Sequence, residues 1–196
     1  MLDRIRTSFE KIAEGGNLKI TISGLPGTGK TTVGKILAKK LNLKFISAGE
    51  IFRKFSEQRG LTLEEFSKFA EENPEIDNKI DQMQKELAEK EKDAIFEGRL
   101  SGWFIKDANL KIWLFANEEI RYERIAKREG KDISVVKSET KMREELEKTR
   151  YKKFYGIDLE DVSIYDLIIN SGKFTAEEIA EIVIKALEFK VSDRKS

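Results

Sequence analysis

The chain has 196 residues, of which 39% are apolar, enough for one α/β domain with its own hydrophobic core. Its 37 lysines and arginines balance 36 acidic residues, and the net charge of +1 argues against a general nucleic-acid binder or a membrane-surface protein. The chain has no cysteine and no histidine, which excludes disulfides, thiol catalysis and imidazole bases. It shows neither an apolar run of membrane-spanning length nor a signal-peptide pattern, so we expect a cytoplasmic protein.

The first half of the chain begins with helical spacing over residues 2–13, which predicts a leading helix. The β-branched, alternating residues 18–23 predict the first strand, and a Gly- and Pro-containing loop separates it from a helix over 30–41. A second strand is predicted at 43–46. Ser47 and Glu50 then form a capping-box pattern. The region that they open predicts helices at 51–59, 63–72 and 74–91.

The second half continues the alternation, with predicted strands at 94–96, 110–116 and 165–170 and predicted helices at 118–128, 133–155 and 175–189. Strands that alternate with helices predict a parallel sheet covered by helices on both faces. The connection between the second and third strands and the charged region between Gly130 and Gly156 are longer than a simple crossover needs. We expect both to lie above the carboxyl edge of the sheet, where ligands of α/β proteins bind.

The loop after the first strand reads Gly-Leu-Pro-Gly-Thr-Gly-Lys-Thr and matches G-x-x-x-x-G-K-[ST], with a strand before it and a helix after it. Glycines let successive backbone N–H groups turn inward around a phosphate, and the following helix adds its positive end. Lys30 is expected to reach the β- and γ-phosphates, and the Thr31 hydroxyl to bind Mg²⁺. The predicted nucleotide-binding residues are Gly24, Leu25, Pro26, Gly27, Thr28, Gly29, Lys30, Thr31 and Thr32.

A GTP-operated switch and a small-substrate kinase both use such a loop. Residues 78–81 read Asn-Lys-Ile-Asp and fit the guanine-reading N-K-x-D string, but they lie in an acidic helical run before the third strand. The chain has no D-x-x-G switch motif, so a solvated helix face explains these residues better. A kinase needs arginines outside the loop to bind a second anion, and the sequence offers Arg121, Arg124 and Arg128 on one helix face. Spacing alone also allows salt-bridged surface helices.

The order of the motifs resembles that of the nucleoside monophosphate kinases over nearly the whole chain after Leu18, most of all the short cytidylate kinases of archaeal type. The segments that carry the resemblance are Gly24–Thr32, Ser47–Arg53, Phe96–Arg99, Glu123–Arg128 and Arg150–Asp158. The resemblance implies a three-layer P-loop NTPase fold with a five-stranded parallel sheet. Together with the predicted elements, it gives a leading helix at 1–17, a core at 18–46, 93–128 and 165–190, a monophosphate-binding insert at 47–92 and a lid at 129–158.

The resemblance also implies an acceptor site for a nucleoside monophosphate. Ser47 and Gly49 would line the pocket for its base and sugar, and Asp77 is a further candidate for base recognition. Arg53 and Arg99 would bind its phosphate, a task that suits the bidentate guanidinium group.

On the donor side, the resemblance implies that Arg124 stacks on the ATP base and that Arg128 holds the ATP phosphates. Arg143 and Arg150 would come down with the lid and neutralise charge on the transferring group, so they join Lys30 and Arg128 as catalytic residues. No general base is needed, because the acceptor oxygen is already anionic.

One position departs from the family pattern, since many relatives carry Asp where this chain has Glu97. Glu97 can still hold Mg²⁺ through water, which makes Thr31 and Glu97 the predicted metal residues. The implied reaction is ATP-dependent phosphorylation of CMP and dCMP by a monomer, without a nucleic-acid or membrane partner. An adenylate kinase, or a P-loop kinase for another small metabolite, remains the alternative.

Overall fold

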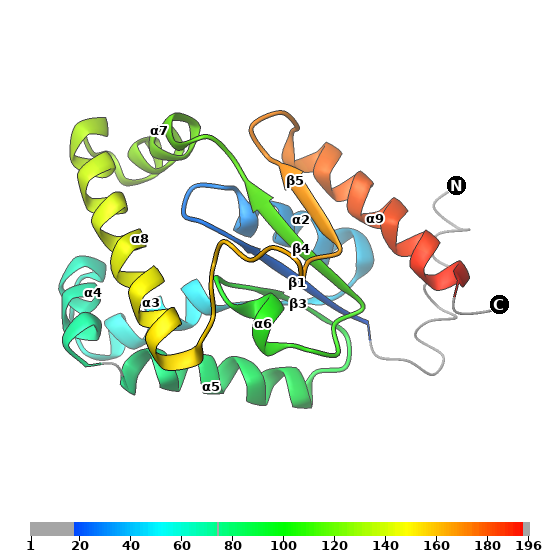
Figure 1. Cartoon of the computed structure of the whole chain (residues 1–196), viewed down its shortest axis with the longest axis horizontal. Coiled ribbons are helices and arrows are strands. Elements are labelled where there is room, and N and C mark those ends of the chain that lie inside the picture. Colours follow the sequence, from blue (N-terminus) through cyan, green and yellow to red (C-terminus); the bar gives the residue numbers. More distant parts are fainter. Residues whose placement is uncertain (1–17, 74, 194–196) are drawn as a thin grey trace.

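The computed structural model describes residues 18–73 and 75–193, whose path is drawn in Figure 1. The leading helix predicted over residues 2–13 lies outside the described residues. The described strands are β1 (Lys19–Gly24), β2 (Lys44–Ser47), β3 (Ala94–Glu97), β4 (Leu110–Phe115) and β5 (Leu167–Asn170). They form one sheet in the order β2-β3-β1-β4-β5, and every neighbouring pair is parallel. The predicted five-stranded parallel α/β fold is therefore confirmed.

The helices that the structure describes are α2 (Lys30–Leu41), α3 (Ala48–Gln58), α4 (Leu63–Glu72), α5 (Glu75–Lys90), α6 (Ser101–Phe104), α7 (Glu118–Glu129), α8 (Ile133–Tyr155) and α9 (Ala176–Asp193). Ser47 is the N-cap of helix α3 and accepts a hydrogen bond from the Glu50 N–H at 3.3 Å, which confirms the predicted cap and adds Ala48–Glu50 to the helix predicted over 51–59. The sequence prediction missed α6, because a single turn is too short to show a 3.6-residue period.

Strand β5 begins at Leu167, later than predicted. Tyr165 and Asp166 lie before it and contact β4 through their side chains. The ring of Tyr165 packs against Trp113 with the centroids 5.2 Å apart, and the Asp166 carboxylate accepts a hydrogen bond from the Lys111 N–H at 2.7 Å. With the hydrogen bond from the Asp166 N–H to the Lys111 carbonyl oxygen at 2.9 Å, these contacts hold residues 165 and 166 beside β4, and the strand itself begins at Leu167.

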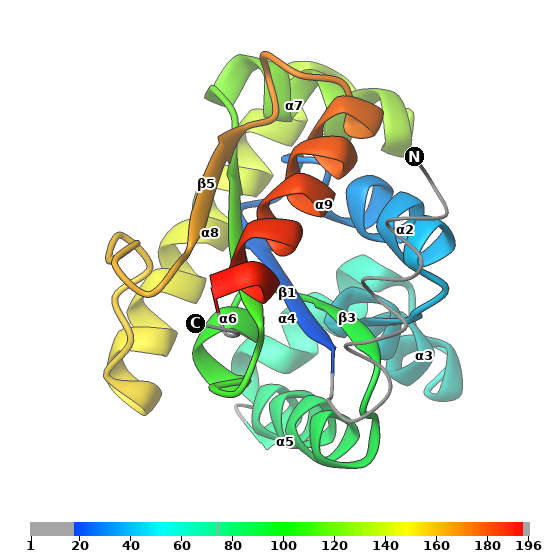
Figure 2. The ribbon, with the colours of Figure 1, turned by 90° about the vertical axis from the view of Figure 1, so that its right-hand side faces the viewer.

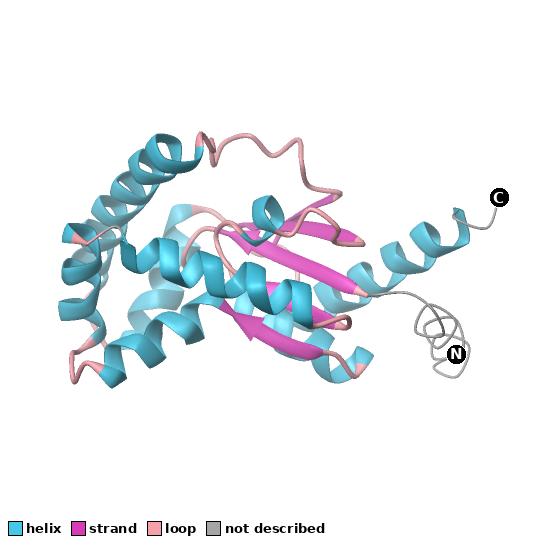
Figure 3. Cartoon of the chain, turned by 90° about the horizontal axis from the view of Figure 1, so that it is seen from below, coloured by secondary structure: helices cyan, strands magenta, loops and turns pink. Residues whose placement is uncertain are grey.

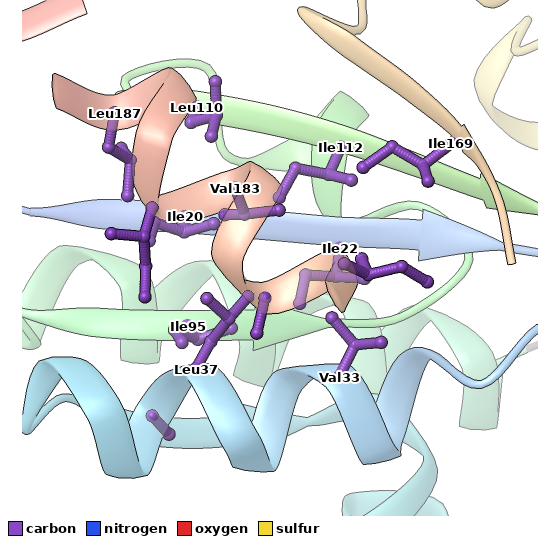
Figure 4. Close-up of a cluster of buried hydrophobic side chains, with 14 of the residues drawn as sticks. Ile20, Ile22, Val33, Leu37, Ile95, Leu110, Ile112, Ile169, Val183 and Leu187 are labelled. Carbon is purple, nitrogen blue, oxygen red and sulfur yellow. The ribbon is translucent and has the colours of Figure 1, made fainter. Parts of the chain in front are cut away.

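Helices α2 and α9 cover one face of the sheet, and α5 and α6 lie on the other, as two views at right angles show (Figures 1 and 2). The larger core lies beneath α2 and α9, where side chains from both helices meet the inward face of the central strands (Figure 4). Every residue of β1 is buried, as expected for the middle strand of a sheet that is covered on both faces. Within the described residues, no helix has the length and the apolar composition needed to cross a bilayer.

The carboxyl ends of the strands point to the end of the molecule where α3, α4 and α8 gather (Figure 3). The loop between β1 and α2 opens at this edge, and β3 ends there with Glu97. Helices α7 and α8 pack together through Tyr122, Ile125 and Val136. The fold therefore brings the phosphate loop and both long connections to one edge of the sheet.

The packing of α9 predicts that truncating two of its side chains will have very different effects on the free energy of unfolding. Leu187 is 1% exposed in this core, whereas Phe189, two residues later on the same helix, is 61% exposed. We expect Leu187→Ala to lower the free energy of unfolding by about 2–5 kcal/mol, through lost burial and a residual cavity. Phe189→Ala is the matched control and should change it by less than about 1 kcal/mol. Urea denaturation measures both, and equal effects would contradict the description of this core.

Candidate active site

The phosphate loop adopts a backbone that only glycine accepts readily at several of its positions. Gly24, Gly27 and Gly29 have φ values of 146°, 77° and 82°. A Cβ atom on Gly27 would also lie 2.5 Å from the Arg121 carbonyl oxygen, and one on Gly24 would lie 2.2 Å from the Leu114 carbonyl oxygen. The glycines thus serve two purposes, because they turn the loop and let it pack directly against α7 and β4.

Lys30 begins α2 and folds back over the loop. Its Nζ donates a hydrogen bond to the Leu25 carbonyl oxygen at 2.9 Å and lies 4.0 Å from Glu97 Oε1. The side chain is 9% exposed. Burial, together with the nearby charge of Arg99, lowers the pKa of Lys30 from 10.5 to about 7. The protein therefore holds a lysine at the loop whose charge an incoming anion can restore.

The carboxylate of Glu97, at the end of β3, joins the phosphate loop to the start of α3. Its Oε2 accepts a hydrogen bond from the Ser47 hydroxyl at 2.5 Å and one from the Thr31 hydroxyl at 3.5 Å. Hydroxyl and carboxylate oxygens at such a loop are the hard donors that suit Mg²⁺. Thr31 and Glu97 therefore fit the metal ion that the sequence predicts, and the glutamate stem is long enough to reach the loop.

A second buried carboxylate, Glu147 on α8, lies between two of the predicted arginines. Arg99 Nε donates to Glu147 Oε2 at 2.5 Å, and Arg99 Nη2 donates to Oε1 at 3.2 Å. Arg143 Nε donates to the same Oε1 at 2.9 Å. Arg99 Nη1 lies 3.4 Å from the carbonyl oxygen of Gly24, the first residue of the phosphate loop. Arg99 and Arg143 are thus brought together at the loop by a residue that was not among the predicted site residues.

This cluster keeps its charges although it is buried. Burial opposes ionisation of Glu147, but the charges of Arg99 and Arg143 outweigh it and hold the pKa of Glu147 at about 2. Burial also disfavours the charged form of Arg99, yet Glu147 raises the pKa of Arg99 above its ordinary value. Each partner stabilises the charge of the other, so both are ionised at neutral pH.

Helix α7 supports the outer side of the phosphate loop through two arginines. Arg121 is buried, donates to the Pro26 carbonyl oxygen at 3.1 Å and pairs with Glu144 of α8 at 2.5 Å. Arg124 Nη1 donates to the Gly27 carbonyl oxygen at 3.3 Å, and its Nη2 donates to the Ser171 carbonyl oxygen at 2.8 Å. Arg124 therefore lies at the loop, and its contact with the ATP base stays a prediction.

The other predicted site residues have less uniform surroundings. A Cβ on Gly49 would lie 3.6 Å from Ser47 Oγ and 3.9 Å from Arg53 Nη1, so these acceptor candidates meet at the start of α3. Arg128 is exposed and pairs with its neighbour Glu129, away from these contacts. Arg150 contributes its charge to Glu147 from one turn further along α8.

For Thr32 and Asp77, the described residues give no contact that bears on their predicted roles. Thr32 is exposed in the first turn of α2, and the side chain of Asp77 lies outside the described parts. The roles of all these residues toward a nucleotide stay predictions.

The predicted site residues do not include Arg121, Glu144 or Glu147. The sequence offers Arg121 only as one of three arginines on a helix face that could bind an anion, and its spacing equally allows salt-bridged surface helices. One signal was present, because Glu144 and Glu147 are three residues apart and thus share a helix face with Tyr151. An aromatic residue on an otherwise charged helix face favours an inward orientation of that face, and Tyr151 is buried in the structure.

A complete phosphate loop after the middle strand of a parallel sheet, with a carboxylate from the neighbouring strand, defines the P-loop nucleotide-binding class. Arginines from the long connections place the chain among the kinases of this class rather than among the switches. The model of the Cytidylate kinase-like family matches residues 19–173, and the chain belongs to that family.

Curated relatives carry the same family name. The chain is 64% identical to a cytidylate kinase of Archaeoglobus fulgidus over 173 residues, which is 88% of this chain and 96% of that protein. It is 47% identical to a cytidylate kinase of Pyrococcus horikoshii over 171 residues, which is 87% of this chain and 88% of the relative.

Solved structures with low sequence identity share the fold. An uncharacterized protein of Eubacterium ventriosum has a TM-score of 0.66 at 19% identity, covering 87% of this chain and 98% of that one. A shikimate kinase of Bacteroides thetaiotaomicron has a TM-score of 0.59 at 20% identity, with the same coverage. At this identity the likeness concerns the fold alone.

The lowered pKa of Lys30 predicts that nucleotide binding takes up a proton. At about pH 8.5 the empty protein holds Lys30 mostly neutral, and an anionic polyphosphate beside the amine favours the ammonium form and raises its pKa. Calorimetric titration of ADP in buffers of different ionisation enthalpy should show an uptake of about 0.5–1 proton per site. Lys30→Gln is the control and should show none. Equal, near-zero uptake in both proteins would contradict the lowered pKa.

Proposed function

We propose that this protein transfers the γ-phosphoryl group of ATP to CMP and dCMP, with Mg²⁺ as the metal ion. The observation that carries the proposal is the meeting, at one sheet edge, of a complete phosphate loop and the Arg99–Arg143 pair. The cytidylate kinase names of relatives at 46–64% identity support CMP as the acceptor. Such a kinase must bind two anions close together, which explains cationic groups on both sides of the loop.

The position of each residue suggests whether it would bind the donor, the metal ion or the acceptor. The backbone N–H groups of the loop and the Lys30 amine would hold the donor phosphates, and Arg124 would lie at the ATP base. Thr31 and Glu97 would hold Mg²⁺, which neutralises phosphate charge when bound. Arg99 and Arg143 would bind the acceptor phosphate and the group in flight, because a guanidinium can contact two phosphate oxygens at once.

Water must be kept from the donor phosphate until the acceptor arrives. Helix α8 reaches both sides of the site, since Glu144 pairs with Arg121 beside the loop and Glu147 pairs with Arg99. The predicted lid over 129–158 contains this helix, and its closure over both nucleotides would exclude water. Its side chains can respond to both nucleotides because they contact both groups of arginines.

A monophosphate panel tests the acceptor. In a coupled assay with ATP and Mg²⁺, CMP and dCMP should be phosphorylated faster than AMP, UMP and GMP. Lys30→Ala should lower turnover by about 100-fold or more, because it removes a cation from the phosphates, while the unfolding temperature stays near that of the unmodified protein. An equal rate with AMP would move the assignment to an adenylate kinase. Full turnover in the folded Lys30 variant would contradict the role of the loop.

The metal site makes a separate prediction for Thr31. Thr31→Val keeps the shape of the side chain but loses the hydroxyl that would bind Mg²⁺. We expect turnover with CMP to fall by roughly 10- to 100-fold, with a higher Mg²⁺ concentration needed for half-maximal rate. ADP binding measured without metal is the control and should change little. An unchanged Mg²⁺ dependence would place the ion on other groups.

A further inference from the structure

Glu147 is an acidic residue in the part of the site that must bind an anion. Its side chain is 6% exposed, and it extends from α8 toward the carboxyl edge of the sheet. Two arginines donate to it, Arg99 through two nitrogens and Arg143 through one. A carboxylate here reduces the positive charge that is available to a phosphate, so its presence needs a physical explanation.

Stability alone is a weak explanation. A buried ion pair gains little over an apolar contact of the same volume, because removing both charges from water costs about as much as their attraction returns. Arg99 and Glu147 are 13% and 6% exposed, so both lose most of their hydration. What such a pair does provide is a fixed geometry, because a guanidinium held by two hydrogen bonds to one carboxylate cannot rotate.

The geometry of Arg99 shows what is fixed. A guanidinium has two edges that can contact two oxygens each, one formed by Nε and one Nη nitrogen and the other formed by the two Nη nitrogens. Glu147 occupies the Nε–Nη2 edge, at 2.5 and 3.2 Å. The remaining nitrogen, Nη1, is directed at the phosphate loop and lies 3.4 Å from the Gly24 carbonyl oxygen. Nη1 therefore faces the loop, where the transferring group must pass.

Arg143 is held by the same carboxylate through a single hydrogen bond. Only its Nε contacts Glu147, at 2.9 Å, and the side chain is 52% exposed. Its terminal nitrogens are thus left to other partners. One carboxylate therefore fixes the direction of Arg99 and also holds Arg143 by its Nε.

We propose that Glu147 is a positioning residue, which aims Arg99 and Arg143 at the acceptor phosphate and does not itself contact the reacting atoms. This inference rests on the proposed function, since it assumes that the acceptor is a nucleoside monophosphate. Because Glu147 belongs to α8, the aim of Arg99 depends on where the lid helix lies. Acceptor binding and the position of α8 are coupled through this one side chain.

The competing possibility is that Glu147 stands in for the acceptor phosphate and must leave when CMP arrives. The two possibilities predict opposite changes in the affinity for CMP when Glu147 is neutralised. If Glu147 blocks the site, its neutralisation frees Arg99 and makes CMP bind more tightly. If Glu147 positions the arginines, its neutralisation lets them rotate and makes CMP bind more weakly.

The test measures CMP binding to the full-length protein by calorimetry, without ATP. In Glu147→Gln the amide replaces one acceptor oxygen by a donor, so the two hydrogen bonds to Arg99 cannot both form. We expect the Kd for CMP to rise roughly 10- to 100-fold, while the Kd for ADP changes much less. Glu145→Gln removes the same charge from the exposed side of the same helix and is the matched control, with an unchanged Kd for CMP. An unchanged or lower Kd in Glu147→Gln would overturn the proposal.

A second variant covers the case in which Glu147→Gln does not fold. Glu147→Asp keeps the charge on a shorter stem that cannot reach both arginines fully, so its Kd for CMP should lie between those of the unmodified protein and the Gln variant. Tighter binding than in the unmodified protein would identify Glu147 as a blocking group and overturn the proposal.

A double-mutant cycle separates positioning from direct contact with the substrate. If Glu147 acts through Arg99, most of the loss caused by Glu147→Gln disappears when Arg99 is already alanine. A loss of the same size in both backgrounds would show direct contact with CMP and overturn the proposal. Failure of the proposed function looks different, because the unmodified protein would then neither bind nor phosphorylate CMP.

Discussion

Charged side chains lie buried or nearly buried at the carboxyl edge of the sheet: Lys30, Glu97, Arg99 and Glu147. None of them could keep its charge there alone, because removing a single ion from water costs several kcal/mol. Mutual neutralisation makes the arrangement possible, with Glu147 beside Arg99 and Glu97 beside Lys30. The compensation is complete for Glu147, whose pKa is about 2, but only partial for Lys30, whose pKa burial and Arg99 lower to about 7. In the empty site, the cationic side chains are therefore paired with carboxylates, and incoming phosphates can become further partners of these cations.

Helix α8 connects the parts of this set. Glu144, Glu147 and Tyr155 lie on one helix face and contact three different regions. Glu144 pairs with Arg121, which supports the phosphate loop, and Glu147 pairs with Arg99. The Tyr155 hydroxyl contacts Asn78 and Asp81 of α5 at 2.6 and 2.7 Å. Most of these contacts are polar, so an incoming anion can compete with them more easily than with an apolar interface.

The apolar core and the long polar connections are different parts of the fold. The sheet and helices α2 and α9 form an apolar core, and solved structures at 19–20% identity share the fold over 87% of the chain. The long connections over α3–α5 and α7–α8 carry the polar and charged groups. Substrate choice can therefore change in the connections without disturbing the core.

The sequence by itself determined the parallel sheet, the phosphate loop and most helix bounds, because these depend on local periodicity, caps and glycine positions. Helix α2 begins at Lys30 and ends at Leu41, as its pattern predicts, and Ser47 caps α3. A resemblance carried by short motifs also led to Arg99, Arg124 and Arg143. Only the tertiary structure decided that Glu147 lies between Arg99 and Arg143 and that Arg121 supports the loop. These contacts join residues up to 95 positions apart, and an acidic residue on a charged helix looks the same in sequence whether its carboxylate meets water or a buried guanidinium.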